Sequence, residues 1–190
     1  MGYKHLTPLL ASNDMLACGE DLGMIPDSVP EVMQELQVLS LEIERMPKQA
    51  NVEFADLTQI PYLSVCTTST HDMATIRIWW EEDKEKTQRY FNKVLGMQGE
   101  APQTCTEDLC EKIILRHLSS PAMLTILPLQ DWLSIDEHIR RENAEMERIN
   151  IPANPHHYWS YRMHINIEDL IENEKLNRKI KNLIIESKRI

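Results

Sequence analysis

The sequence lacks the features that would place the chain in a membrane, outside the cell or on a nucleic acid. No run reaches the roughly 18–20 apolar residues of a transmembrane helix, and the N-terminal residues Met1–Leu6 do not resemble a signal peptide. Basic residues are scarce, with 20 Lys and Arg against 30 Asp and Glu, so the formal net charge is -10. Because nucleic acids and anionic membranes bind basic surfaces, this balance disfavours both as partners.

Cysteine is also scarce, and no metal-binding spacing is present. The four cysteines, Cys18, Cys66, Cys105 and Cys110, form no Cys-x-x-Cys motif. Without a secretion signal, all four are predicted to be reduced thiols in the cytoplasm. The seven histidines include no His-x-x-x-His pair on a predicted helix, so we expect no zinc or other metal site.

What remains is an ordinary globular composition, 42% hydrophobic and 26% charged, in which apolar runs alternate with helical segments. The apolar runs predict strands at Met15–Cys18, Leu39–Arg45, Tyr62–Thr67 and Met123–Leu129. Capping residues and apolar spacing predict helices from Asp27 or Ser28 to about Val38, over Ala74–Leu95, from Thr106 to about Leu118, and from Asn166 onward. The type of Leu6–Ala11 stays open, and the charged stretch Ser134–Asn150 is expected to be helical in part.

This order indicates an α/β fold with a parallel sheet covered on both faces, in a single domain over residues 1–190. Polar clusters follow three of the strands, at Glu20–Asp21, His71–Asp72 and Gln130–Asp131. The carboxyl edge of a parallel sheet or barrel is where such folds build their sites. Adjacent acids after a strand point to opposite faces, so we expect one of Glu20 and Asp21 to face a pocket and the other to anchor the loop. The alternative is that these clusters are ordinary polar turns.

Two acids on different strand ends suit glycoside cleavage, in which one protonates the leaving oxygen and another attacks or stabilises the sugar cation. A neighbouring pair such as His71 and Asp72 suits binding of sugar hydroxyls through charge-assisted hydrogen bonds. Flat side chains for sugar stacking are Tyr62, Trp79, Trp80, Trp132 and Trp159, although each is also a candidate core residue. Spacing alone does not choose between sugar chemistry, a metal-binding barrel and a structural role.

Four motifs resemble successive motifs of the 4-alpha-glucanotransferases, the amylomaltase or disproportionating-enzyme group of glycoside hydrolase family 77. They are Cys18-Gly-Glu-Asp-Leu-Gly-Met-Ile-Pro26, Thr70-His-Asp72, Ala74-Thr-Ile-Arg-Ile-Trp-Trp-Glu-Glu82 and Pro128-Leu-Gln-Asp131. The segments Trp79–Asp83, Val32–Leu36 and Arg45–Pro47 are similar to the longer branch, which includes the cytosolic plant enzyme and bacterial relatives. The resemblance covers about Met15 to Arg162.

The resemblance implies roles for particular residues. Glu20 matches the general acid/base after barrel strand five, Asp72 matches the transition-state stabiliser after strand seven, and His71 matches a sugar-binding histidine. Asp21 and Trp79 are further candidates for substrate binding. Gln130, Asp131, Arg148, Asn150 and Pro152 match family positions whose roles look structural or peripheral. No metal or organic cofactor is implied, and the implied substrate is an α-1,4-glucan or maltooligosaccharide.

One family motif is missing. The nucleophile is an aspartate in an Arg-Ile-Asp-His-like motif at the end of strand four, and no such motif occurs in this sequence. The resemblance therefore implies that the four predicted strands correspond to strands five to eight, so the chain is similar to the carboxyl-terminal half of a (β/α)8 barrel with a terminal helix. We expect the chain alone to be inactive, and to need the amino-terminal half of the barrel or to self-associate. The alternative is a non-catalytic fragment or remnant that at most binds glucan or associates with itself.

Overall fold

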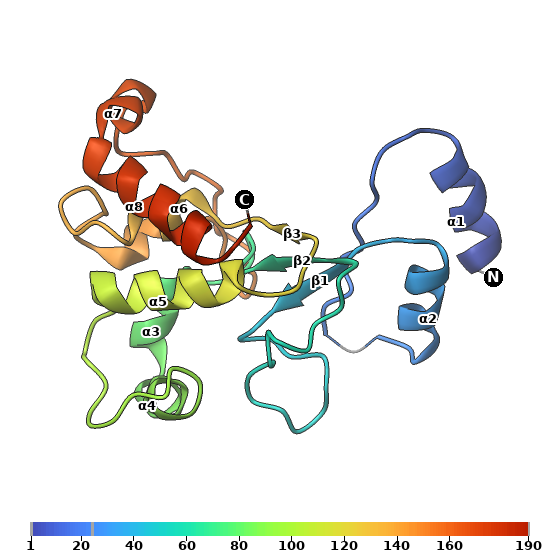
Figure 1. The fold of residues 1–190 in the computed structure, drawn as a ribbon, viewed down its shortest axis with the longest axis horizontal. Coiled ribbons are helices and arrows are strands. Elements are labelled where there is room, and N and C mark those ends of the chain that lie inside the picture. Colours follow the sequence, from blue (N-terminus) through green and yellow to red (C-terminus); the bar gives the residue numbers. More distant parts are fainter. Residues whose placement is uncertain (1, 24, 190) are drawn as a thin grey trace. The chain divides into compact units, whose positions relative to one another are not determined.

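The computed structural model describes residues 2–23 and 25–189, which divide into two compact units. Unit 1 comprises residues 1–67 and 120–126, and unit 2 comprises residues 68–119 and 127–190. Figure 1 gives the order of the elements along the chain, and each unit is described by itself below.

Unit 1 is built on a small parallel sheet (Figure 1). The strands β1 (Ser40–Ile43), β2 (Ser64–Thr67) and β3 (Leu124–Thr125) lie in that order, and both pairs are parallel. An isolated parallel bridge from Cys18 to Leu39 adds the first predicted run beside β1. The predicted parallel arrangement of four consecutive apolar runs is therefore confirmed, and the fold is α/β.

The two faces of this sheet carry different side chains. Leu41 lies opposite Val65, which lies opposite Leu124, so these three residues share one face. Cys66 points to the other face, where it is fully buried in an apolar cluster. The other members of that cluster are Leu57, Ile60 and Ala122. The other face is also apolar and buried, since Val65 and Ile43 are 7% and 2% exposed, so both faces of the sheet are covered by core side chains.

Two helices complete unit 1. The open segment Leu6–Ala11 belongs to α1 (Gly2–Ala11), and α2 (Ser28–Glu35) ends before the predicted Val38 because Gln37 adopts a φ of 55°. A Cβ at Gly19 would lie 2.9 Å from Cε of Met33 on α2. A larger residue at this position would displace the flexible end of the Met33 side chain, so glycine leaves room for that side chain between α2 and the first strand.

The prediction of a short buried strand at Met15–Cys18 was wrong in extent. Met15 and Leu16 are 76% and 57% exposed, and only Cys18 makes a bridge. The register explains this, because Cys18 lies opposite Leu39, and the residues that the same register places opposite Met15 and Leu16 are in the turn that follows α2 rather than in a strand. No neighbouring strand is in place there to cover the two side chains.

Unit 2 is helical within the described residues. Its elements are α3 (Ile76–Glu82), α4 (Lys84–Lys93), α5 (Glu107–Leu118), α6 (Leu129–Leu133), the 3-10 helix η1 (Ala144–Glu147), α7 (Ile167–Glu172) and α8 (Glu174–Glu186). The helices α5 and α8 lie side by side (Figure 1), and the core includes the fully buried Trp80, Tyr90 and Ile114. No helix in the described ranges is long and apolar enough to cross a membrane.

Two predicted helices are each divided in two by a capping residue. Ala74–Leu95 splits at Asp83, whose side chain accepts a hydrogen bond from the Lys86 amide, 3.0 Å away, and so starts α4. The terminal helix splits at Asn173, whose side chain accepts from the Leu176 amide at 2.9 Å. Short polar side chains compete for backbone amides, which is why they interrupt a helical pattern that apolar spacing alone would continue.

The fourth predicted strand, Met123–Leu129, is shortened for a related reason. Only Leu124–Thr125 pairs with β2, and the apolar residues that follow lead through Pro128 into α6. Proline fixes φ and is well suited to the start of a helix. The strand is present where predicted, but residues 126–128 have no regular structure and Leu129, the last residue of the run, begins α6.

Candidate active site

In unit 1, Asp21 anchors the loop that follows the first strand. Its side chain is 6% exposed, its Oδ1 accepts from the Leu41 amide at 2.8 Å, and its Oδ2 lies 2.7 Å from the Lys48 ammonium. Lys48 also bridges to Glu42 at 2.7 Å, and Ser40 donates to the same Glu42 oxygen at 2.8 Å. Both oxygens of Asp21 therefore bind groups of the chain itself, which matches the anchoring role expected for one of the two adjacent acids.

Glu20 is exposed, and its backbone position is fixed by the sheet. The amide of Gly19 donates to the Leu39 carbonyl at 2.8 Å, and the Leu39 amide donates to the Ala17 carbonyl at 2.9 Å. Asp21 is buried against β1 and Lys48, whereas the side chain of Glu20 is accessible to solvent. Glu20 is therefore the acid of the pair that is available to a ligand.

A cavity of about 590 Å³ lies on the Asp21 side of unit 1. Its charged lining residues are Asp21, Asp27, Glu42 and Lys48, and Met33 and Tyr62 belong to its apolar wall. Its volume is within the range of small-molecule sites. The lysine was not predicted as part of any site, because nothing in the spacing of Lys48 relative to the two acids signals that one ammonium joins them.

In unit 2, Asp72 lies in a small polar and aromatic group. Its side chain is 45% exposed, its Oδ1 accepts from the Asn150 amide at 2.6 Å, and its Oδ2 lies 3.4 Å from Nε2 of His71. The His71 ring in turn contacts the Trp159 ring, with 5.2 Å between the centroids. An accessible carboxylate, a histidine and a half-exposed indole are suited to bind hydroxyls and a flat apolar face at the same time.

Sequence reasoning did not connect Asn150 and Trp159 with Asp72. Asn150 was expected to be structural or peripheral, and it lies 78 positions from the aspartate that it contacts. The sequence signal was present in weak form, because Asn150 belongs to a family motif and Trp159 was one of five candidate stacking residues. Only the fold brings the two segments together.

The segment that carries His71 and Asp72 is held at both ends by Asp131, which is fully buried. One carboxylate oxygen accepts from the hydroxyl of Thr68 and, at 3.5 Å, from that of Ser69, while the other accepts from the Ile76 amide at 2.9 Å. These bonds tie both ends of the Thr68–Ile76 segment, which carries His71 and Asp72, to the start of α6. The expected structural role of Asp131 fits this geometry.

Trp79 lies in the aromatic core of unit 2. It is 8% exposed, and its ring makes edge-to-face contacts with Trp80 and Tyr90 at centroid distances of 6.4 and 5.0 Å. This packing is typical of a core residue, which was the alternative to sugar stacking for each of the aromatic side chains. Direct sugar contact by Trp79 stays a prediction.

The predicted site residues are therefore distributed between the two units. Glu20 and Asp21 belong to unit 1, and His71, Asp72 and Trp79 belong to unit 2. Within unit 2 the structure brings His71 and Asp72 together, and it places Trp79 in the core. Among the described residues, no group of three or more His, Cys, Asp and Glu side chains is arranged to hold a metal ion.

Comparison with known proteins identifies the relatives of this chain. The 4-alpha-glucanotransferase DPE2 of rice (Oryza sativa subsp. japonica) is 43% identical over 186 residues, covering 98% of this chain and 20% of the rice protein. The 4-alpha-glucanotransferase of Chlamydia trachomatis is 32% identical over 182 residues, covering 93% of this chain and 33% of that protein. The chain thus spans a fifth to a third of the length of these relatives.

Solved structures agree on the fold. An amylomaltase from Streptococcus agalactiae in complex with acarbose matches with a TM-score of 0.69 at 17% identity, covering 95% of this chain and 33% of that one. An amylomaltase from Corynebacterium glutamicum matches with a TM-score of 0.60 at 16% identity, over 89% of this chain and 28% of that one. The sequence profile of 4-alpha-glucanotransferase matches residues 3–167. The chain therefore belongs to the 4-alpha-glucanotransferase family.

Proposed function

We propose that this chain is part of a retaining 4-alpha-glucanotransferase, which transfers glucosyl or maltooligosaccharide units between α-1,4-glucans. Family membership and the order of the four motifs support the activity of the parent protein. The observation that carries the proposal for this chain is the arrangement around Asp72. A half-exposed carboxylate is oriented by Asn150 and lies beside His71, whose ring contacts Trp159.

In the proposed mechanism, Glu20 protonates the oxygen of the leaving sugar and then removes a proton from the acceptor hydroxyl. Asp72 and His71 bind hydroxyls of the distorted ring, where charge-assisted hydrogen bonds are strong. Asp21 and Trp79 contribute to substrate binding through the segments that they anchor, since both side chains are engaged within the chain. The reaction requires no metal and no organic cofactor.

We further propose that the strands of unit 1, with the Cys18 bridge, are strands five to eight of a (β/α)8 barrel, and that residues 1–190 form a single partial catalytic domain. Their parallel order along the chain supports this assignment. Retaining enzymes need two carboxyls about 5–5.5 Å apart. Since the 190 residues contain no Arg-Ile-Asp-His-like motif for the nucleophile, the isolated chain is proposed to be inactive.

The test is incubation of the purified chain with maltooligosaccharides, followed by chromatography. The chain alone should give no ladder of longer and shorter products. Addition of the barrel segment that precedes the matched region in the rice relative should produce a ladder, and Glu20→Gln should abolish it. A ladder of products from the 190-residue chain by itself would contradict the proposal that the isolated chain is inactive.

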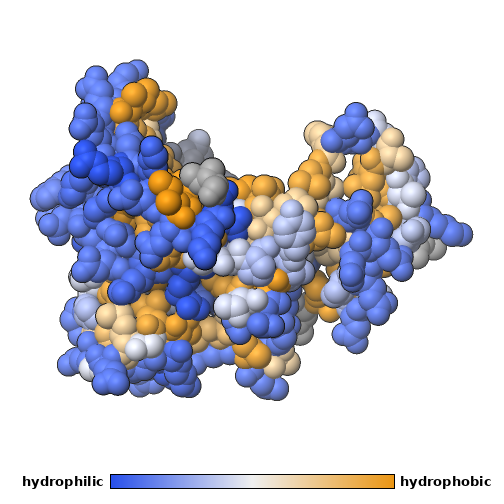
Figure 2. All heavy atoms as spheres, viewed as in Figure 1, coloured by the Kyte–Doolittle hydropathy of each residue, from blue (hydrophilic) through white to orange (hydrophobic). Residues whose placement is uncertain are grey.

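A second candidate is a non-catalytic chain that binds glucan or associates with itself. Exposed apolar side chains favour it, since Met15, Leu16 and Ile126 of unit 1 are 76%, 57% and 60% exposed. Figure 2 shows apolar surface on α7 in unit 2, where Ile167 and Ile171 are 64% and 75% exposed. Large exposed apolar surfaces mark contacts with other chains. The amino-terminal half of the barrel, or a second copy, is the proposed occupant.

Light scattering measures whether the chain is a monomer or a self-associated oligomer. A monomer that gains no activity from the added barrel segment would contradict association with either occupant.

We propose the cytoplasm as the location of the chain. Four cysteines without disulfide or metal spacing suit a reducing compartment.

A further inference from the structure

The orientation of Asp72 depends on a segment without regular secondary structure. Asn150 donates to Asp72 from the stretch Arg148–Asn150, which directly follows η1. A half-exposed carboxylate in a loop has several orientations of similar energy unless a neighbour selects one of them. The question is therefore what fixes Asn150.

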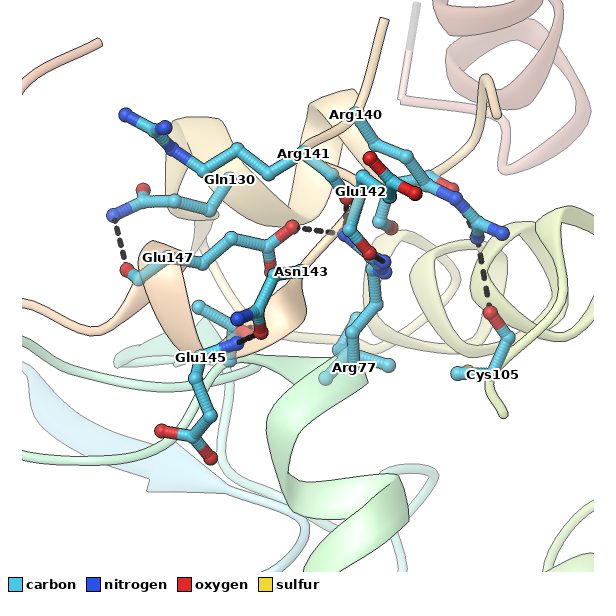
Figure 3. A network of polar contacts seen from close by, with 12 residues as sticks. Arg77, Cys105, Gln130, Arg140, Arg141, Glu142, Asn143, Glu145 and Glu147 are labelled. Atoms are coloured by element: carbon cyan, nitrogen blue, oxygen red, sulfur yellow. Dashed lines mark hydrogen bonds and ion pairs between the residues drawn. The ribbon is translucent and has the colours of Figure 1, made fainter. Parts of the chain in front are cut away.

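Arg148 pairs with Glu82 at 2.8 Å and His157 contacts the Ile149 carbonyl at 2.9 Å, but the most deeply buried contacts of this region involve the carboxylate of Glu147, the last residue of η1. Glu147 is 3% exposed, pairs with Arg77 of α3, and accepts from the Thr75 hydroxyl at 2.9 Å. Its backbone carbonyl accepts from the Gln130 side chain at 3.2 Å. Figure 3 shows Arg77 and Glu147 pointing toward each other from α3 and η1.

Arg77 also holds the chain on the other side of η1. The same guanidinium donates to the Arg141 carbonyl at 2.6 Å and to the Glu142 carbonyl at 3.3 Å (Figure 3). One buried side chain of α3 therefore fixes the backbone before η1 and the carboxylate at its end. A planar guanidinium with several donors is suited to this, because its geometry specifies where each acceptor must lie.

We propose that the buried Arg77–Glu147 pair is the positioning element of the Asp72 group, acting by fixing the segment from which Asn150 reaches Asp72. Neither residue touches the aspartate itself. The consequence for sugar binding rests on the proposed function, whereas the consequence for Asn150 does not.

The alternative is that the pair only stabilises unit 2, and physical chemistry separates the two cases. Burying two charges costs solvation energy, and apolar residues of similar volume in their place are often neutral or stabilising. The variant Arg77→Met with Glu147→Met should therefore stay folded. A purely structural role predicts that it leaves Asn150 unchanged, and a positioning role predicts that Asn150 is released.

The experiment uses the 190-residue chain and follows the Asn150 side-chain amide by heteronuclear NMR. In the wild type, this amide should show a shifted, exchange-protected signal, because it donates to a carboxylate at 2.6 Å. In the double variant, its signal should move to that of an exposed asparagine. The single variant Glu147→Gln keeps the side-chain shape and an acceptor for Arg77. Its Asn150 signal should therefore move in the same direction as in the double variant, but by less.

A second measurement is titration of the same proteins with acarbose by calorimetry. The double variant and Asn150→Ala should each weaken binding about tenfold, and their effects should not add, because both remove the same contact. A matched control replaces an ion pair elsewhere in unit 2, Lys179→Met with Glu111→Met, whose charged atoms lie 2.6 Å apart. This control should leave the Asn150 signal and acarbose binding unchanged.

A wild-type Asn150 signal in the folded double variant would overturn the proposal. If the double variant unfolds, Glu147→Gln decides in the same way, because an unchanged signal refutes positioning and a shifted one supports it. A wild-type chain that does not bind acarbose would count against the proposed function, while the NMR result would still decide the role of Arg77 and Glu147.

Discussion

In unit 1 a sheet fixes the backbone of the candidate acid, whereas in unit 2 the candidate aspartate depends on side chains. Glu20 follows directly after residues that bond to Leu39, next to β1. Asp72 lies in a loop whose ends are tied by the buried Asp131, and its carboxylate is oriented by Asn150. Backbone ladders tolerate many side chains, but a loop that is held by a few side chains fails when one of them is removed.

The largest effect should follow from removing Asp131. In Asp131→Ala, the Ile76 amide and the Thr68 hydroxyl lose a buried acceptor, so the free energy of unfolding of unit 2 should fall by about 3 kcal/mol. Urea titration followed by tryptophan fluorescence measures this, because all four tryptophans belong to unit 2.

The matched control is Asp131→Asn, which keeps one acceptor oxygen and should lose less than half as much. An Asp131→Ala variant within about 0.5 kcal/mol of the wild type, roughly the effect of an ordinary surface substitution, would remove the contrast between the two units.

A smaller effect is expected from Lys48 in unit 1. In Lys48→Met, Asp21 and Glu42 lose the ammonium that they share, and the local free energy of unfolding should fall by about 1–2 kcal/mol because Lys48 is partly exposed. Hydrogen exchange of the Leu41 amide, which donates to Asp21, reports the change directly. Adding Glu42→Gln should restore part of the protection, and unchanged exchange in Lys48→Met would show that the sheet alone holds the loop.

A local cap should matter less than either network. Asp83→Ala removes the acceptor for the Lys86 amide at the start of α4 and should cost about 1 kcal/mol of unfolding free energy in unit 2. Asp83→Asn retains a capping oxygen and should lie within a few tenths of the wild type. The same urea titration applies, and equal stability of the alanine and asparagine variants would contradict a capping role.

The smallest expected effect is a pH dependence that arises from Glu147. Burial raises the pKa of Glu147, and the facing Arg77 offsets this only in part. Between the ordinary glutamate value of about 4.3 and the raised pKa, the folded state binds the proton more readily than the unfolded state does. The stability of unit 2 should therefore fall as pH rises through this window, and Glu147→Gln should remove that fall.

Glu107 provides a control of opposite sign. Burial acts to raise its pKa, but hydrogen bonds from the Glu137 amide and from Lys179 prevail and lower it. Its stabilising contribution is present at neutral pH and is lost as pH falls below the ordinary glutamate value. Urea titrations from about pH 3 to about pH 7, which covers the range in which carboxyl groups titrate, compare Glu147→Gln and Glu107→Gln with the wild type. Identical dependence of stability on pH in all three proteins would contradict the pKa directions given for both glutamates.

Much of the fold follows from local pattern. The apolar runs at β1 and β2 and the helix α5 were predicted close to their observed bounds, because apolar periodicity and capping residues act within a few positions. The same pattern overextended the Met15–Cys18 strand and joined helices that Asp83 and Asn173 separate. These errors occur where a neighbouring segment, or a single side-chain hydrogen bond, decides the outcome.

For this protein, the sequence by itself determined the family, the parallel order of the strands and the positions of Glu20 and Asp72 after their strands. The tertiary structure decided which side chains serve each acid: Lys48 for Asp21, Asn150 for Asp72, and Arg77 for Glu147. The reason is physical. Motifs and periodicity record interactions between near neighbours in the chain, whereas these three side-chain contacts join residues 27 to 78 positions apart, and only folding brings such residues together.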